Sequence, residues 1–193
     1  MKTLNHLRQE LLAKRLDLHQ DSSLRDELES KITQFLNETD ANCVGIYWPI
    51  KSEFDLRPLA LDWSSKNPKK KLALPIVKLN EPLIFGEWNQ DTTLVKGPQN
   101  INEPLLDSFS SKIDPDLLII PCLGWSAQND QFWRIGYGGG YYDRTIAEFK
   151  KNIFQIFILM ALLSSCRKEI LMLSYSAITV GEEVRLNDVM VLN

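Results

Sequence analysis

The most informative part of this chain is a glycine-rich stretch that reads Arg134-Ile135-Gly136-Tyr137-Gly138-Gly139-Gly140-Tyr141-Tyr142-Asp143-Arg144. The apolar run before it, Leu117–Pro121, is typical of a buried strand, and residues 145–149 are typical of a helix. Glycines between a strand and a helix let successive backbone N–H groups point inward, and the helix adds the positive end of its dipole. The stretch is therefore predicted to bind an anion, with a glycine-rich hairpin or a flexible surface loop as the alternative.

The charged residues of this stretch fit a phosphate ligand. Arg134 and Arg144 could donate charge-assisted hydrogen bonds to phosphate oxygens, and Asp143 could hold a metal ion that bridges them. The two common nucleotide motifs do not explain the stretch. No GxxxxGK[ST] sequence occurs, and Tyr141 stands where the GxGxxG pattern requires glycine.

The order R-hydrophobic-G-Y-G-G-G-Y-Y-D-R, after an apolar strand ending at Pro121, resembles the 5-formyltetrahydrofolate cyclo-ligase family. In that family the loop lies on both ATP and the folate, and its Asp binds magnesium. Other segments match in the family's order across residues 2–149: Leu7-Arg8 with Arg15, Tyr47-Trp48-Pro49 followed by Glu53, residues 71–75, and Glu103-Pro104.

The resemblance implies an ATP- and magnesium-dependent conversion of 5-formyltetrahydrofolate to 5,10-methenyltetrahydrofolate, with release of ADP and phosphate. No nucleophilic side chain is required. It implies these ATP-binding residues: Arg8, Arg134, Gly136, Gly138, Gly139, Gly140 and Tyr142. It implies these folate-binding residues: Trp48, Glu53, Tyr137 and Tyr141. Asp143 is the expected magnesium ligand.

The chain departs from the family pattern at two places. Leu4 stands where the family carries a cation four residues before Arg8, and Lys2 is the nearest substitute. The tail, residues 153–193, lacks the short acidic motif that completes the family's metal site, and Asp188 is the acid closest in type. Asp188 is therefore kept as a candidate second metal ligand. A folate- or nucleotide-binding protein of the same fold that has lost turnover is the alternative function, and an enzyme sharing only the layered fold ranks below it.

Elements alternate along the sequence, which predicts a single α/β domain over residues 1–193, with a mixed or mostly parallel central sheet flanked by helices. An N-terminal helical pair is expected: one helix over residues 3–18, then a second capped by Ser22 or Ser23. On the first helix, Arg8 and Arg15 share the polar side two turns apart, and by default such a side faces solvent.

Strands are expected at residues 43–48, 72–75 and 83–86, with Asp55 capping a helix after the first of them. Glu53 would then lie near a strand's carboxyl end, where open α/β sheets bind ligands, although an ordinary exposed loop carboxylate is the alternative. Trp48 suits either the core or stacking on a pterin. The polar residues 126–130 are expected to form a surface loop.

The composition and charge of the chain limit the classes of partner that it can bind. A net charge of −3 and a pI near 5.5 give no basic footprint for nucleic acid. The 3 cysteines show no CxxC pairing, which suits a cytoplasmic protein, and the charged N-terminus lacks the apolar core of a secretory signal. The apolar run 153–163 is about half of the roughly 20 residues that span a bilayer, so a buried strand or core helix is expected and a membrane partner is not. We expect a monomer.

Overall fold

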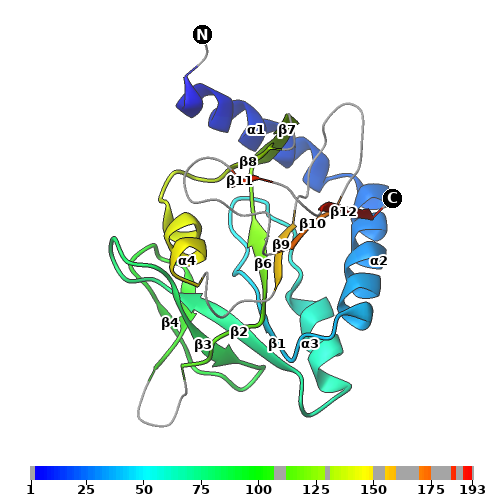
Figure 1. Ribbon diagram of the computed structural model, residues 1–193, viewed down its shortest axis with the longest axis vertical. Coiled ribbons are helices and arrows are strands. Elements are labelled where there is room, and N and C mark those ends of the chain that lie inside the picture. Colours follow the sequence, from blue (N-terminus) through cyan, green and yellow to red (C-terminus); the bar gives the residue numbers. More distant parts are fainter. Residues whose placement is uncertain are drawn as a thin grey trace.

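A mixed sheet forms the centre of the computed structural model, which describes residues 3–106, 112–128, 131–149, 155–159, 170–174, 184–185 and 189–192 (Figure 1). Its 7 strands lie in the order β12-β10-β9-β6-β1-β2-β3. Their bounds are β1 (Cys43–Gly45), β2 (Lys71–Ile76), β3 (Ile84–Trp88), β6 (Leu117–Pro121), β9 (Gln155–Leu159), β10 (Ile170–Ser174) and β12 (Val189–Leu192). The four strands β9, β6, β1 and β2 run parallel, and the flanking strands β3, β10 and β12 pair antiparallel. The predicted α/β class with a mixed sheet is confirmed.

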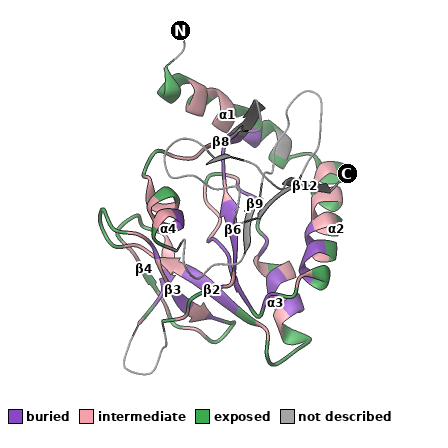
Figure 2. Cartoon of the chain, in the orientation of Figure 1, coloured by how far each residue is buried: buried purple, intermediate pink, exposed green. Residues whose placement is uncertain are grey.

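The apolar run Leu117–Pro121 forms β6, a strand in the middle of the sheet that is buried on both faces. Burial on both faces is the usual fate of a parallel strand, and it explains why the run does not alternate with polar residues. Neighbouring β1 approaches it closely, because a Cβ on Gly45 would lie 2.5 Å from Leu118 Cδ2. Figure 2 shows in purple that most residues of β6 and β2 are buried, so these strands form part of the core.

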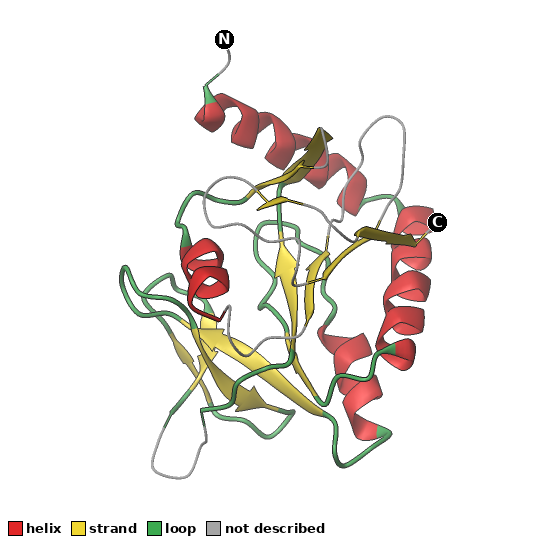
Figure 3. Cartoon of the chain, viewed as in Figure 1, coloured by secondary structure: helices red, strands yellow, loops and turns green. Residues whose placement is uncertain are grey.

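The helices α1 (Leu4–His19) and α2 (Ser22–Glu38) form the expected N-terminal pair, and α3 (Arg57–Ser65) lies against α2. Figure 3 shows α2 and α3 on one side of the sheet, with α4 (Tyr141–Phe149) on the other side. Apolar side chains of α2 and α3 pack with those of the strands in one core cluster: Ile32, Phe35, Leu36, Ala60, Trp63, Val44, Leu72, Leu74, Leu117 and Ile119.

The predicted cap of α2 is wrong, and the predicted cap of α3 is right in part. Asp21 caps α2, because its Oδ1 accepts from the Leu24 N–H at 3.1 Å. Asp21, Ser22 and Ser23 are all good capping residues, so only the backbone geometry selects among them. Leu56 is the N-cap residue of α3 and makes no side-chain hydrogen bond there. The Asp55 carboxylate accepts from the Arg57 backbone N–H at 3.2 Å, as a capping side chain does, and also pairs with the Arg57 guanidinium at 2.7 Å.

A second sheet, with strand order β11-β8-β7, joins β7 (Gly124–Gln128), β8 (Gln131–Ile135) and β11 (Val184–Arg185). The expected surface loop is therefore wrong for residues 126–128, which belong to β7. The ladder runs to the pair Gln128↔Gln131, so the backbone pairing holds this polar segment as a hairpin although its composition is that of a turn. Residues 129–130 of that prediction lie outside the described residues.

Two further expectations concern single elements. Of the β-prone residues 43–48, only Cys43–Gly45 forms a strand. The apolar run 153–163 contributes β9 (Gln155–Leu159), and its other residues lie outside the described part.

A small hairpin of β4 (Leu94–Lys96) and β5 (Asn102–Pro104) was not predicted. Among the helices of the described ranges, none combines the length and the apolar character that crossing a membrane requires.

Candidate active site

A cavity of about 590 Å³ opens where β1, β2 and β6 end, at the carboxyl edge of the parallel strands. Its wall includes the loop after β1, the ends of β2 and β6, the turn between β4 and β5, and the glycine-rich stretch that joins β8 to α4. Ligands of open α/β sheets bind at such an edge, because the loops there converge.

Most of the predicted site residues come together in this cavity. Its wall contains Trp48, Glu53, Arg134, Gly136, Tyr137, Gly138, Gly139, Gly140, Tyr141, Tyr142 and Asp143. Arg8 is not part of the wall and reaches the loop by donating from Nε to the Gly136 carbonyl at 3.0 Å. The predicted metal ligand Asp188 lies outside the described residues.

The glycine-rich loop needs glycine at two positions for conformational reasons. Gly138 has φ +93° and Gly140 has φ +65°, values that side chains disfavour. A Cβ on Gly138 would also lie 3.2 Å from the Arg8 guanidinium carbon, and one on Gly140 would lie 2.7 Å from Arg144 Nη1. Arg144 donates to the Gly139 carbonyl at 3.0 Å. The loop is thus fixed in shape by two arginines that bind its backbone.

The helix α4 begins at Tyr141, directly after this loop, and includes residues 145–149, which the sequence predicts to be helical. Its first turn has backbone N–H groups without helical partners and carries the positive end of the helix dipole. The combination of glycine backbone, helix N-terminus and the Arg134 guanidinium gives this wall of the cavity a positive character.

Arg134 and Asp143 form an ion pair in that wall. Arg134 Nη2 lies 2.5 Å from Asp143 Oδ1, and Nη1 donates to the Pro121 carbonyl at 3.3 Å. The Arg134 side chain is 8% exposed and that of Asp143 is 57% exposed. Asp143 can therefore exchange its arginine partner for a ligand from the cavity without breaking the packing.

The described residues of the cavity offer too few carboxylates to hold Mg²⁺ by protein groups alone, but enough to hold it together with a phosphate ligand and water. Among the described residues there is no group of three or more His, Cys, Asp or Glu side chains arranged to hold a metal ion. Mg²⁺ commonly keeps several waters and binds through one or two carboxylates together with substrate phosphates. A single reachable carboxylate, Asp143, next to a phosphate-binding loop fits that arrangement.

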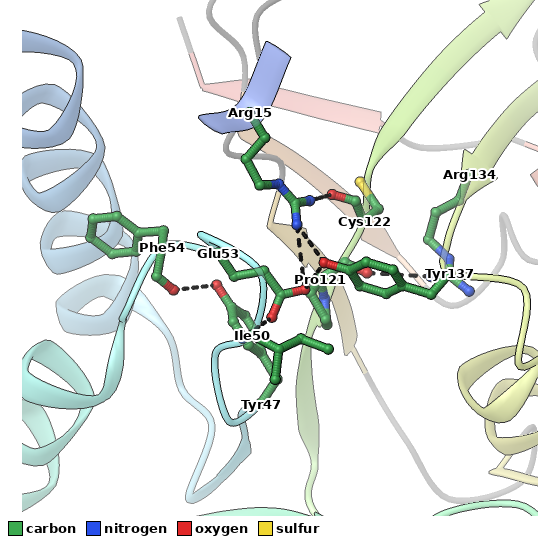
Figure 4. A network of polar contacts seen from close by, with 9 residues as sticks. All are labelled: Arg15, Tyr47, Ile50, Glu53, Phe54, Pro121, Cys122, Arg134 and Tyr137. Atoms are coloured by element: carbon green, nitrogen blue, oxygen red, sulfur yellow. Dashed lines mark hydrogen bonds and ion pairs between the residues drawn. The ribbon is translucent and has the colours of Figure 1, made fainter. Parts of the chain in front are cut away.

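A buried polar network forms another part of the site and joins three distant segments of the chain (Figure 4). Arg15 Nη1 donates to the Tyr137 hydroxyl at 2.6 Å and lies 3.6 Å from Glu53 Oε1. The Tyr137 hydroxyl donates to Glu53 Oε1 at 3.0 Å, and the Ile50 N–H donates to Oε2 at 2.8 Å. Arg15 also donates to the Cys122 carbonyl. Arg15 and Glu53 are 3% and 5% exposed, so both charges are removed from water.

Burial is the main influence on the acidity of these groups. It raises the pKa of Glu53, although the Ile50 N–H, Arg15 and Tyr137 partly offset the effect. Burial and the nearby Glu53 carboxylate also raise the pKa of Tyr137 and of Tyr142. Tyr137 therefore stays a neutral hydroxyl that can donate to the carboxylate.

The expectation of a solvent-facing Arg15 is wrong, and so is the alternative of an exposed Glu53. Each supplies the charge that makes burial of the other tolerable. The sequence held one usable signal. Arg15 follows Arg8 by two helical turns, so both lie on one side of α1, and a side that contacts the glycine loop at Arg8 also faces the protein at Arg15.

Trp48 is partly buried against the core cluster and also lines the cavity. The core alternative therefore holds in part, and stacking on a pterin stays a prediction. The Arg57 guanidinium carbon lies 3.9 Å from the ring centroid, which covers one face by a cation–π contact. Neighbouring Tyr47 is buried and donates to the Phe54 carbonyl at 2.7 Å, which holds the loop that carries Glu53.

Known proteins resemble this chain in sequence and fold. Over 155 residues it is 23% identical to the 5-formyltetrahydrofolate cyclo-ligase of Mycoplasma pneumoniae, a match covering 77% of this chain and 79% of that protein. The solved 5,10-methenyltetrahydrofolate synthetase of Aquifex aeolicus has a TM-score of 0.60 at 23% identity, covering 98% of this chain and 96% of that one. The synthetase structure from Mycoplasma pneumoniae gives a TM-score of 0.57 at 18% identity, covering 96% of each chain. These likenesses confirm the fold.

The sequence model of one family matches residues 1–170, which include every residue that lines the cavity. The match extends past residue 149, where the resemblance read from the sequence ends. The chain belongs to the 5-formyltetrahydrofolate cyclo-ligase family.

Proposed function

We propose that this protein converts 5-formyltetrahydrofolate to 5,10-methenyltetrahydrofolate, using ATP and releasing ADP and phosphate. The observation that carries the proposal is the composition of one cavity. A positive wall of glycine backbone, helix N-terminus and Arg134 meets a wall with aromatic side chains and the buried carboxylate of Glu53. The first suits a triphosphate, and the second suits a flat heterocycle with N–H groups.

The chemistry needs positioning more than a reactive side chain. A formamide oxygen is a poor leaving group, so the γ-phosphoryl group of ATP is transferred to it and ADP departs. N10 then attacks the formyl carbon, the bond from that carbon to the phosphorylated oxygen breaks, and N10 loses its proton. Holding N10 near the formyl carbon and neutralising the phosphoryl charge supply the rate enhancement.

On the nucleotide side, we assign phosphate binding to Arg134 and to the backbone of residues 136–140, with Tyr142 behind them. Arg8 holds this loop through the Gly136 carbonyl. Asp143 is the proposed magnesium ligand, and Mg²⁺ when bound would neutralise charge on the phosphates. Asp188 remains the proposed second carboxylate.

On the folate side, we assign Trp48, Tyr137 and Tyr141 to the wall around the ring system and Glu53 to a contact with the folate. A carboxylate has about four lone-pair positions, so the hydrogen bonds from Ile50 and Tyr137 leave Glu53 able to accept one from the substrate. The Tyr141 hydroxyl accepts from Gln99 Nε2 at 3.4 Å, which links this wall to the turn after β4.

We also propose that the protein acts as a monomer in the cytoplasm. One chain supplies every residue of the cavity wall. Cys43 and Cys122 are buried free thiols, and burial raises the pKa of each to about 12, which suits a reducing compartment.

The direct test is turnover. We expect purified protein with magnesium, ATP and 5-formyltetrahydrofolate to form 5,10-methenyltetrahydrofolate, seen as a new near-ultraviolet absorbance band. Omitting ATP should abolish the band. Tight folate binding without the band in the complete mixture would contradict the enzyme proposal and leave a binding protein.

Replacing Arg134 with alanine should impair the use of ATP more than the binding of folate. The guanidinium is held at the cavity by Pro121 and Asp143, and charge-assisted hydrogen bonds to phosphate are lost with it. We expect kcat/KM for ATP to fall at least tenfold, about 1.4 kcal/mol. Arg25→Ala, on the exposed surface of α2, is the matched control. A folded Arg134→Ala protein with unchanged ATP kinetics would remove Arg134 from the site.

A further inference from the structure

Glu103 is a buried carboxylate in the cavity wall whose hydrogen-bonding capacity is only partly used. It lies on β5, lines the cavity and is 4% exposed. Within the described part of the chain, its Oε1 has no hydrogen-bond partner. Buried polar atoms are nearly always paired, so such an atom at the wall of a ligand cavity points to a partner on the ligand.

The Glu103 carboxylate occupies space that is free only because residue 97 is glycine. A Cβ on Gly97 would lie 1.9 Å from Glu103 Oε1, so the carboxylate packs against the bare backbone of the turn between β4 and β5. Two backbone hydrogen bonds fix that turn, from Asn100 N–H to the Gly97 carbonyl and from Gly97 N–H to the Ile101 carbonyl, each at 2.9 Å.

The surroundings of Glu103 offer little compensation for its charge. Val77, Leu83 and Ile101 form the neighbouring apolar part of the cavity wall. Burial raises the pKa of Glu103, and the Val77 backbone N–H offsets only part of that effect. An acidic side chain kept in such a place lowers the stability of the free protein, which is typical of a group retained for binding.

The chemistry of the two substrates decides which one meets this carboxylate. A carboxylate accepts hydrogen bonds and does not donate them. The pterin ring of 5-formyltetrahydrofolate presents two adjacent donors, the N3–H and the 2-amino group. Adenine places a ring-nitrogen acceptor beside its amino group, as its base edges do in nucleic acids, and the glutamate tail of the folate is itself anionic. The ribose of ATP carries two hydroxyls that also donate to carboxylates, but the apolar side chains in this part of the wall suit a flat ring, so the pterin edge with its paired donors is the better match.

We propose that Glu103 binds the N3–H and 2-amino edge of the pterin ring and thereby orients the folate in the cavity. This assignment rests on the proposed function, since it names the part of the substrate that one wall of the same cavity receives. It makes Glu103 a specificity-determining residue. An analogue without the 2-amino group would lose this hydrogen bond. It would also leave a buried carboxylate oxygen without a partner, which weakens its binding further.

The test is equilibrium binding of 5-formyltetrahydrofolate, followed by tryptophan fluorescence without ATP, to the wild type and to Glu103→Gln. We expect the variant to bind at least tenfold more weakly, about 1.4 kcal/mol, because an amide presents one acceptor where the ligand needs two. We expect its Tm without ligand to be unchanged or higher. Glu87→Gln, the same change on β3 outside the cavity wall, removes only a surface ion pair with Lys71, so it should leave the affinity unchanged and the Tm within a degree or two.

A second ligand shows whether the contact is direct. The 2-desamino analogue, in which hydrogen replaces the amino group, should bind the wild type at least tenfold more weakly than 5-formyltetrahydrofolate. Glu103→Gln should distinguish the two ligands by less than threefold, because the partner of the amino group is already gone. Glu103→Gln with wild-type affinity, or wild type that binds both ligands equally, would overturn the assignment.

Failure of the proposed function has a different signature. Wild-type protein that binds 5-formyltetrahydrofolate with the expected dependence on Glu103, yet forms no methenyl product, supports the assignment and contradicts the catalytic proposal. Wild-type protein that does not bind 5-formyltetrahydrofolate overturns both.

Discussion

Replacing Arg15 with methionine should lower the free energy of unfolding by about 3–5 kcal/mol, because it leaves Glu53 as a buried charge without its ionic partner. The Cys122 carbonyl and the Tyr137 hydroxyl lose a donor in the same substitution. Methionine fills a similar length of apolar space, so the loss reports the charge and not a cavity. Urea unfolding at neutral pH measures the change, and Arg25→Met on the exposed surface of α2 is the control.

The effect of Arg15→Met should also depend on pH. Burial raises the pKa of Glu53 already, and removing Arg15 raises it further. A carboxyl with a raised pKa in the folded state favours folding while it is protonated, and that contribution is lost as pH rises through the folded-state pKa. The destabilisation should therefore be smaller at pH 5 than at pH 8. The double variant Arg15→Met/Glu53→Gln should recover part of the loss at pH 8. Equal stability of wild type and Arg15→Met at both pH values would mean that the network contributes nothing.

Asp143→Asn should lower magnesium-dependent kcat/KM by at least 100-fold, about 2.7 kcal/mol, while leaving Tm within a degree or two. Asparagine nearly keeps the shape of aspartate but loses the charge that a hard cation requires. The side chain is mostly exposed and lies in the first turn of α4, where asparagine is tolerated. Steady-state kinetics across a magnesium titration measures the effect, and Glu148→Gln, exposed on the same helix, is the control.

Asp143 has a second possible role, because it also orients the Arg134 guanidinium. If it acts only through Arg134, Asp143→Asn should weaken ATP use at every magnesium concentration and leave the midpoint of the magnesium curve unchanged. A shifted midpoint supports direct coordination, whereas a shared midpoint rules it out. The same titration with Asp188→Asn shows whether the tail supplies a second ligand.

The parts of this protein that the sequence predicts well are those set by local chemistry. Glycines at positive φ, a continuous apolar strand and a helix over residues 145–149 each leave a short-range signature, so the loop and its place between strand and helix could be predicted. The same reasoning failed where several local solutions were equally good. Asp21 and its two serine neighbours all suit a helix cap, and the polar residues of β7 suit a turn as well as a hairpin strand.

The buried charges could not be predicted because their burial is decided by how distant segments dock. Arg15 looks like any polar residue of an amphipathic helix until α1 is placed against the loop that carries Tyr137. Glu103 reads as an ordinary acid before a proline, and only the packed turn at Gly97 removes it from water. For Arg15 the spacing from Arg8 shows only that the two residues share a side of α1, and for Glu103 the signal lies in tertiary packing alone.

The contacts of Arg15 also bear on the order in which the molecule folds. Its partners lie far along the chain, 107 residues away at Cys122 and 122 residues away at Tyr137. During synthesis Arg15 leaves the ribosome well before Cys122 and Tyr137 are made, so its charge is solvated by water until they are. Closing contacts of such long range is slow, because the entropy of the intervening loops is lost before the contacts form. We therefore expect the cavity to be completed late in folding, after the segment that carries Tyr137 has been made.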